Sequence, residues 1–277
     1  RAHLPAADVE WLAAHPATRV LQEAGERVVA GAERYGDANT AAETAAQGST
    51  LNLVSYMART RDAWKQNSRC FLQIVASTRY DMVVGDESYE VTLALREQPR
   101  AKTFRYAFIV DFAGIHPMTW SPAERLGVWI LNRLWSADYR QKRRPPYDVG
   151  LFVGEPDDVP DTRFGLGLPN RRAFAEAMYT FVGYVFPFDV REYADKAGVR
   201  SRLGYGTEPL VVCSIGGTAI GREMLELCGR AVVVARRTRP DLRAILVTGP
   251  RLSPDALALP PQIEVRAFVP RLYEHFA

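Results

Sequence analysis

The segment from Leu210 to Gly221, Leu-Val-Val-Cys-Ser-Ile-Gly-Gly-Thr-Ala-Ile-Gly, constrains the fold of this chain more than any other feature. An apolar run leads into a pair of glycines, and apolar residues then recur 4, 3, 4 and 3 positions apart, the spacing of one helix face. These residues are Ile220, Met224, Leu227, Ala231 and Val234. Glycines let a backbone approach a ligand closely, and the first turn of a helix presents unpaired N–H groups at the positive end of its dipole. The segment therefore predicts a strand, a turn and a helix that together bind a phosphate or diphosphate.

The composition sets the class of protein. With 277 residues the chain is long enough for one large or two ordinary domains, and its apolar (47%) and charged (24%) fractions exclude disordered and fibrous classes. The formal net charge of +3 is too small to indicate a nucleic-acid partner. No apolar run approaches the ~18 residues that span a bilayer. Cys70, Cys213 and Cys228 lack metal or redox spacing, so reduced thiols, no metal site and a cytoplasmic location are expected.

Strand-like and helix-like segments alternate along the first half of the chain, which favours a parallel sheet covered by helices. The expected strands are Asp8–Leu12, Glu26–Val29, Met82–Val84, Tyr106–Val110, Val149–Val153 and Phe181–Val185. The expected helices are Ala17–Ala24, Leu51–Thr78, one that begins near Val91, and Pro122–Tyr139. The segment 37–48 is rich in Ala and Thr and fits either a loop or a weak helix.

The polar segment from Pro187 to Pro209 is interpreted as a linker because it contains several glycines. We therefore expect a first domain at residues 1–186, a linker at 187–208 and a second domain at 209–277. The strands of the second domain are expected at Leu210–Ser214, Ala244–Thr248 and Ile263–Phe268.

The ends of the chain indicate a truncated protein. A nucleotide-binding α/β domain usually needs roughly 100 residues, and far fewer follow Gly221. The chain also starts at Arg1 without an initiator methionine. We therefore expect the second domain to be incomplete.

The glycine pattern excludes two common nucleotide sites. A dinucleotide fold would show Gly-x-Gly-x-x-Gly and an acid about 20 residues later, at the end of the next strand. Here the spacing is Gly-Gly-x-x-x-Gly, and the next expected strand ends in Val247-Thr248-Gly249-Pro250 without a carboxylate. The Walker pattern is also missing, because no Gly-Lys-Ser/Thr occurs. A diphosphate site of another type remains, as does a glycine turn that serves only tight packing of strand and helix.

The segment Val211–Gly221 resembles the glycine loop in the C-terminal domain of GT-B glycosyltransferases, a group that includes the UDP-glycosyltransferases and the N-acetylglucosaminyl transferase that completes lipid II. The segments Arg243–Pro250 and Ile263–Tyr273 are similar to the second and third strands of that domain. In the first half, the resemblance rests on Tyr80–Glu87, Leu151–Gly167 and Phe181–Tyr184. It covers most of residues 8–277 and is specific mainly around 210–221.

The resemblance implies an α/β fold of two Rossmann-like domains, with the acceptor bound by the first and the donor by the second. The implied reaction is inverting, metal-independent hexosyl transfer from a nucleotide-sugar, a UDP-sugar, to the hydroxyl of a lipid-linked molecule or a glycan, without a cofactor. Backbone N–H groups would stabilise the departing diphosphate. By motif match these belong to Ser214, Gly216, Gly217 and Thr218, and the nucleotide base would contact Phe268 and Val269.

Two parts of the family pattern are not found. The glycine loop that carries a histidine would precede Arg1, and the segment whose glutamate grips the ribose would follow Ala277. We therefore expect this chain to be an inactive fragment of a transferase. A UDP-sugar 2-epimerase-like enzyme and a non-catalytic protein that binds nucleotide-sugars or partners are the alternatives.

Three residues are candidates for acid–base catalysis because ligands of open α/β sheets bind beyond the carboxyl ends of strands. Asp86 and Asp111 each follow an expected strand, and His116 lies in the loop after Asp111. Each could deprotonate or orient an acceptor hydroxyl. The alternatives are that the two acids cap a helix or turn, and that His116 is an ordinary loop residue. Glu87 is interpreted as an acid of a first helical turn.

A basic cluster ends one expected helix: Arg140, Lys142, Arg143 and Arg144. Cations are favourable at the negative end of a helix dipole, so the cluster is consistent with a solvated helix terminus. It also suits contact with anionic lipid or a phosphorylated acceptor, which would place the protein peripherally at the inner face of a membrane.

Overall fold

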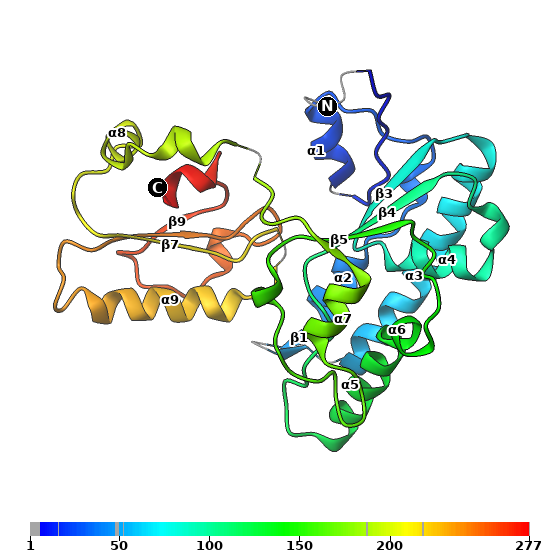
Figure 1. Cartoon of the computed structure of the whole chain (residues 1–277). Helices are drawn as coiled ribbons and strands as arrows, with labels where there is room; N and C mark the ends of the chain where they lie inside the picture. Colours follow the sequence, from blue (N-terminus) through cyan, green and yellow to red (C-terminus); the bar gives the residue numbers. More distant parts are fainter. Residues whose placement is uncertain are drawn as a thin grey trace. The chain divides into compact units, whose positions relative to one another are not determined.

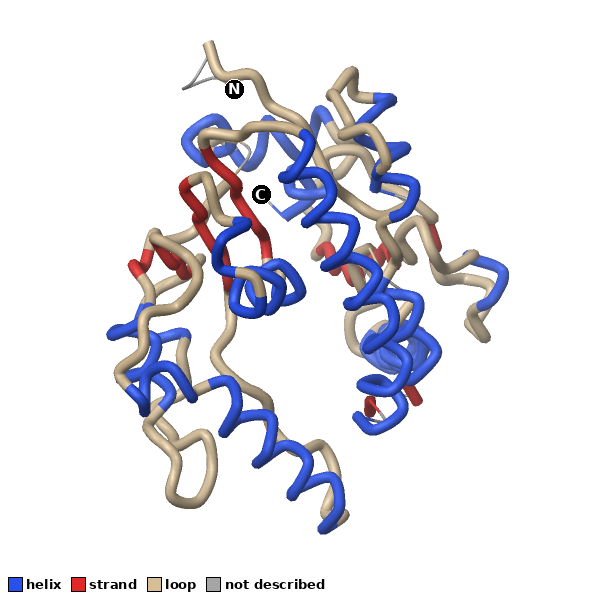
Figure 2. The backbone as a smooth tube through the Cα atoms, turned by 90° about the vertical axis from the view of Figure 1, so that its right-hand side faces the viewer, coloured by secondary structure: helices blue, strands red, loops and turns tan. Residues whose placement is uncertain are grey.

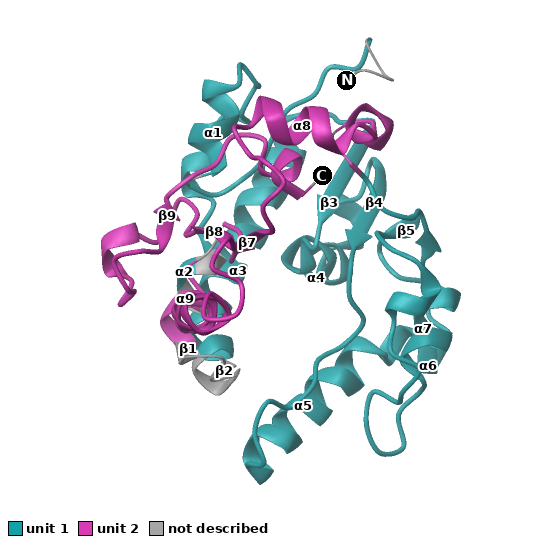
Figure 3. Ribbon diagram, turned by 90° about the vertical axis from the view of Figure 1, so that its left-hand side faces the viewer, with its two compact units in different colours: residues 1–41, 53–185 teal, residues 42–52, 186–277 magenta. Residues whose placement is uncertain are grey.

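The computed structural model describes residues 6–15, 17–47, 50–51, 53–186, 188–217 and 219–276. Residue contacts divide the chain into two compact units (Figure 3). The first comprises residues 1–41 and 53–185, and the second comprises residues 42–52 and 186–277. The segment 42–52 thus belongs to the second unit, although its position in the sequence placed it in the first expected domain. Each unit contains its own parallel sheet, so the expected α/β class is confirmed.

The sheet of the first unit has the order β3-β4-β5-β6, with every pair parallel. Its strands are β3 (Met82–Asp86), β4 (Arg105–Val110), β5 (Val149–Phe152) and β6 (Thr180–Phe181). Before the sheet come α1 (Ala17–Glu23), η1 (Ala32–Arg34), α2 (Ala38–Ala45) and α3 (Leu53–Ser77). The connections contain α4 (Tyr89–Glu97), η2 (Pro99–Ala101), α5 (Pro122–Trp135), α6 (Ala137–Gln141), η3 (Pro156–Asp158) and α7 (Arg171–Met178) (Figure 1).

The core of the first unit lies between the sheet and its helices. In β4 the buried Tyr106, Phe108 and Val110 alternate with residues of the other face, as the two-residue period of a strand requires. They pack in one cluster with residues of α3, α4, α5 and α7. Consecutive parallel strands joined by right-handed crossovers place their helices on the same face, which explains the single core.

The second unit has the order β7-β8-β9, again all parallel. Its strands are β7 (Leu210–Ser214), β8 (Arg243–Val247) and β9 (Glu264–Arg266), and a separate antiparallel pair is formed by β1 (Ala46–Gln47) and β2 (Thr50–Leu51). Its helices are η4 (Val190–Tyr193), α8 (Lys196–Arg202), α9 (Arg222–Ala235), η5 (Pro254–Ala256) and η6 (Leu272–Phe276). Helices and loops make up most of the chain, and strands are short (Figure 2).

Both faces of β8 are covered, because Ala244 and Leu246 pack with α9 while Ile245 and Val247 pack with Tyr205.

The prediction of which apolar face of α9 is buried was wrong. Met224, Leu227 and Val234 are each more than half exposed, whereas Leu225 and Val232 are buried. The helix carries a second apolar row, and the side chain of Leu259 lies where a Cβ on Gly229 would be. Because Gly229 has no side chain, Leu259 can pack directly against the helix there. The row that contains Gly229 is therefore the buried one.

Other predicted elements change in length. The first two expected strands form only one bridge, between Trp11 and Val28, and the strand expected at Phe181–Val185 shortens to β6. The helix expected at Pro122–Tyr139 divides at Ser136 into α5 and α6. The Ser136 hydroxyl donates to the Asn132 carbonyl at 2.9 Å, a local bond that competes with regular helix geometry.

Candidate functional site

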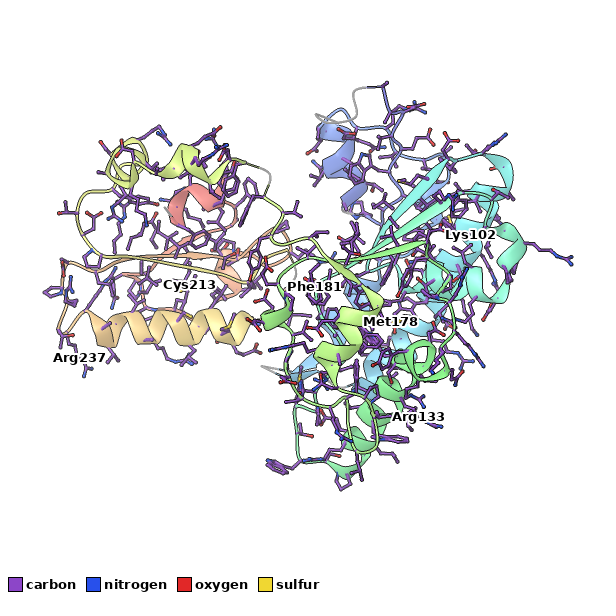
Figure 4. The ribbon with its side chains drawn as sticks, in the orientation of Figure 1. Lys102, Arg133, Met178, Phe181, Cys213 and Arg237 are labelled. Carbon is purple, nitrogen blue, oxygen red and sulfur yellow. The ribbon has the colours of Figure 1, made fainter. Side chains whose placement is uncertain are left out.

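The glycine loop, residues 215–221, connects the carboxyl end of β7 to α9. Gly216 and Gly221 have φ of 80° and 101°, a region that favours glycine. A Cβ placed on Gly216 or Gly217 would meet no other heavy atom within 4 Å. The backbone at Gly216 and Gly217 is therefore accessible, as a diphosphate site requires. Cys213, the residue before the last of β7, marks its position in Figure 4.

The residues that follow β8 pack against the glycine loop. Gly249 has φ of 76°, and a Cβ there would lie 2.1 Å from the Gly216 carbonyl oxygen. Only glycine fits this contact, because both the backbone conformation and the neighbouring oxygen exclude a side chain. The loop after β8 and the glycine loop after β7 are thus in main-chain contact at the carboxyl edge of the sheet.

One backbone N–H of the glycine loop donates to a carboxylate of the protein itself. The Ala219 N–H donates to Glu43 Oε1 at 3.0 Å. The same carboxylate receives Arg251 Nε at 2.6 Å and Arg251 Nη2 at 2.9 Å. Nearer to β7, the Gly216 N–H donates to the Ser214 hydroxyl at 3.3 Å. Sequence patterns gave no sign of Glu43 or Arg251, because neither belongs to a local motif.

The donor residues expected from the resemblance fall in different surroundings. Thr218 lies outside the described residues, and the helix that it was expected to start begins at Arg222, with Gly221 as N-cap. Phe268 is 70% exposed, whereas the Val269 side chain is buried in the core of the second unit. Phe268 is therefore available to a ligand, whereas Val269 as a whole is only 5% exposed.

In the first unit, the carboxyl ends of β3 and β4 bring acids together. Asp86 ends β3, and Asp111 follows β4, its parallel neighbour. Glu87 joins them through a hydrogen bond with Asp111, and its backbone N–H donates to the Ile109 carbonyl at 2.9 Å. Glu87 has φ of 47°, an unusual value for this residue type. We call Asp86, Glu87 and Asp111 the acid cluster. Sequence reasoning placed Glu87 in a helix, but α4 starts later, after the N-cap Ser88.

Within the acid cluster, the pKa values of Glu87 and Asp86 are raised. Burial, followed by the hydrogen bond with Asp111 and the charges of Asp111 and Asp86, raises the pKa of Glu87 to about 8. Burial, with the charge of Asp111, also raises the pKa of Asp86. Glu87 Oε1 and the Tyr89 hydroxyl are buried without a hydrogen-bond partner. A carboxyl group whose pKa is raised in this way can act as an acid or a base near neutral pH.

His116 belongs to a different set of contacts. Its Nε2 lies against Arg171 Nη1, and Arg171 Nη2 donates to the Ile115 carbonyl at 2.9 Å. Asn132 fixes the same loop, since its Oδ1 accepts from the Ile115 N–H at 2.9 Å. Burial and the charge of Arg171 lower the pKa of His116, which favours a neutral imidazole that accepts from the guanidinium. Among the described residues, no interaction joins His116 to the acid cluster.

The basic cluster lies at the end of α6, where Lys142 has φ of 51° and Arg140 donates to the Arg133 carbonyl at 2.9 Å. No helix in the described part of the chain is long and apolar enough to cross a membrane. Within the same residues, no three His, Cys, Asp or Glu side chains form a group that could hold a metal ion.

No protein-family model matches the sequence, and no curated protein matches it. The chain is similar to the glycotransferase of kitacinnamycin, at 14% identity and a TM-score of 0.49 over 96% of this chain and 65% of that one. It is similar to the glycosyltransferase SnogD from Streptomyces nogalater at 16% identity and a TM-score of 0.47, over 95% of this chain and 65% of that one.

A third similar structure is described as a UDP-N-acetylglucosamine 2-epimerase from Listeria monocytogenes, at 13% identity and a TM-score of 0.35 over 76% of this chain and 52% of that one. The chain thus spans about 65% of the length of the two glycosyltransferases and about half that of the third protein.

Proposed function

We propose that this chain is part of a GT-B glycosyltransferase that transfers a sugar from a nucleotide-sugar to an acceptor hydroxyl. The observation that carries the proposal is the accessible glycine loop at the carboxyl end of β7, where a backbone N–H already holds a carboxylate. Helix N-termini and glycine turns at this edge of a parallel sheet are where α/β proteins bind phosphate groups.

In the proposal, the donor diphosphate binds at the glycine loop of the second unit. The N–H groups of Ser214, Gly216, Gly217 and Thr218 stabilise the charge that develops as the diphosphate leaves. Phe268, which is exposed, contacts the base. UDP is the proposed nucleotide, on the strength of the sequence resemblance at 210–221.

The acid cluster of the first unit supplies the acid–base chemistry of the proposed reaction. A carboxylate of the pair Glu87 and Asp111 accepts the proton of the acceptor hydroxyl. The oxygen then attacks the anomeric carbon while the bond from that carbon to the diphosphate oxygen breaks, which inverts the configuration. His116 has a positioning role at most, because Arg171 already occupies its Nε2.

The same acid cluster also suits a UDP-sugar 2-epimerase, in which a carboxylate would remove a proton from the sugar ring without an acceptor. The two functions share a donor site and differ in their products. A non-catalytic protein would bind the nucleotide and release nothing. Incubation with a UDP-sugar therefore separates the three: transfer yields UDP and a glycosylated acceptor, epimerisation yields an isomeric UDP-sugar, and pure binding leaves the donor unchanged.

The donor site is tested by substitutions at Gly217, measured as UDP affinity by calorimetry. Gly217→Ala should fold as the unmodified chain does, because its Cβ would meet no protein atom within 4 Å, and it should weaken binding less than either larger side chain. Gly217→Asp should weaken binding at least tenfold through repulsion of the diphosphate, and Gly217→Asn, of the same size without charge, should weaken it less. Equal affinities for the Asp and Asn variants would contradict the assignment.

A further inference from the structure

Glu43 reaches the glycine loop from far away in the sequence. It lies in α2, 176 positions before Ala219, yet by contacts it belongs to the second unit. Glu43 is the single charged residue of the α2 sequence Ala-Asn-Thr-Ala-Ala-Glu-Thr-Ala. Its Oε1 accepts from the Ala219 N–H and pairs with Arg251 Nε, and its Oε2 accepts from Arg251 Nη2. Bidentate pairing of this kind fixes position as well as charge.

The position of Arg251 is set by the glycine loop itself. Arg251 follows Gly249, whose main chain touches the Gly216 carbonyl and admits no side chain. The backbone two residues before Arg251 is therefore held in contact with the glycine loop. The side chains of Glu43 and Arg251 are each only 17% exposed, so water screens this pair less than a surface pair.

The donors that hold Glu43 are those that phosphate groups use. A planar guanidinium matches the oxygens of a phosphate as well as those of a carboxylate, and the Ala219 N–H in the loop before α9 adds a second contact. A diphosphate carries more negative charge and more acceptor oxygens than one carboxylate, so it has the stronger attraction for the same donors.

We propose that Glu43 is an internal anion that occupies a phosphate position formed by Arg251 and the Ala219 N–H, and that a nucleoside diphosphate displaces it on binding. The inference rests on the proposed function of the glycine loop and adds two residues to it. Arg251 is then a ligand of the donor diphosphate. Glu43 competes with the diphosphate for Arg251. The competition lowers the apparent affinity for the donor by the fraction of molecules in which Glu43 stays in place.

The test compares variants of the full chain in binding of inorganic pyrophosphate and UDP, both measured by calorimetry. Glu43→Gln removes the competing charge and keeps the shape of the side chain, so both ligands should bind about tenfold more tightly. Arg251→Gln should weaken both at least tenfold. Asp241→Asn is the matched control, because Asp241 pairs with Arg239 at 3.3 Å before β8, at the opposite end of the sheet from the glycine loop. It removes the same charge and should leave both affinities unchanged.

Unchanged or weaker binding of pyrophosphate by Glu43→Gln would overturn the inference, as would equal gains in the Asp241→Asn control. If Glu43→Gln binds pyrophosphate more tightly while UDP binds to no variant, the competition stands and the proposed nucleotide-sugar function fails.

A measurement on the unmodified chain covers the case in which a variant does not fold. Pyrophosphate should increase amide hydrogen exchange within residues 42–45, because release of Glu43 removes its contacts with Ala219 and Arg251. Unchanged or slower exchange there at saturating pyrophosphate would overturn the inference.

Discussion

The two units carry the same kind of parallel sheet but place different chemistry at its carboxyl edge. In the first unit, acid side chains gather after β3 and β4, and their surroundings raise the pKa of Glu87 to about 8. In the second, the edge after β7 and β8 presents the main chain of glycines and one N–H that holds a carboxylate. A side-chain site depends on the identity of each residue, whereas a backbone site depends on the absence of side chains. The two sites should therefore respond to different substitutions.

The largest effect is expected where main chain touches main chain. Gly249 and Gly204 both have φ of 76°, but a Cβ would meet the Gly216 oxygen at 2.1 Å in the first case and nothing within 4 Å in the second. Gly204→Ala should lower the free energy of unfolding by about 1 kcal/mol, the cost of the backbone conformation alone. Gly249→Ala should lower it by about 3 kcal/mol, because the clash adds to that cost. Urea denaturation measures both, and equal losses would show that the two loops are not in contact.

The acid cluster predicts a pH dependence that the glycine loop lacks. Glu87 holds its proton in the folded chain up to about pH 8, whereas in the unfolded chain its pKa returns to about 4.5. The stabilisation is therefore complete below pH 4.5 and is lost as the pH rises towards 8. Between pH 5 and 8 the unmodified chain should lose about 2 kcal/mol of stability, an amount reduced by solvent screening of the cluster.

The source of that pH dependence can be located by substitution. Glu87→Gln should flatten the loss of stability between pH 5 and 8, since the amide does not ionise. Glu97→Gln, which changes an exposed acid at the end of α4, should retain it. Melting temperatures of the three proteins across this pH range decide the matter. A Glu87→Gln profile as steep as that of the unmodified chain would show that the proton is held elsewhere.

The smallest effect is expected from the side chain nearest the backbone site. Ser214→Ala removes the acceptor of the Gly216 N–H, a bond of 3.3 Å at an exposed position. The free energy of unfolding should fall by about 0.5 kcal/mol, and UDP affinity should change less than threefold, because the main chain makes the contacts. A loss of binding comparable with that of Gly217→Asp would show that the Ser214 hydroxyl itself contacts the ligand.

Local signals in the sequence predicted the parts of the fold that depend on neighbouring residues. The bounds of β7 and the turn at Gly216 follow from an apolar run and a glycine pair. The positions of Asp86 and Asp111 after parallel strands likewise implied that they meet at one edge. Phe268 and Val269, both expected at the donor base, lie just after β9, where Phe268 is exposed and the Val269 side chain packs in the core.

The exposed face of α9 illustrates what local signals leave open. Two apolar rows are available to this helix, and the period of 3.6 residues fits either. The contact between Gly229 and Leu259 selects one row, and Leu259 follows the helix by more than one element. Such a choice depends on which side chains meet after folding.

The sequence by itself determined the alternation of strands and helices, the two parallel sheets and the glycine loop, because these follow from periodicity and from the backbone freedom of glycine. Only the tertiary structure decided that Glu87 joins Asp111, that Gly249 presses on Gly216, and that Glu43 pairs with Arg251. Burial and distance, which raise a pKa or exclude a Cβ, arise only when segments far apart in the chain are brought together.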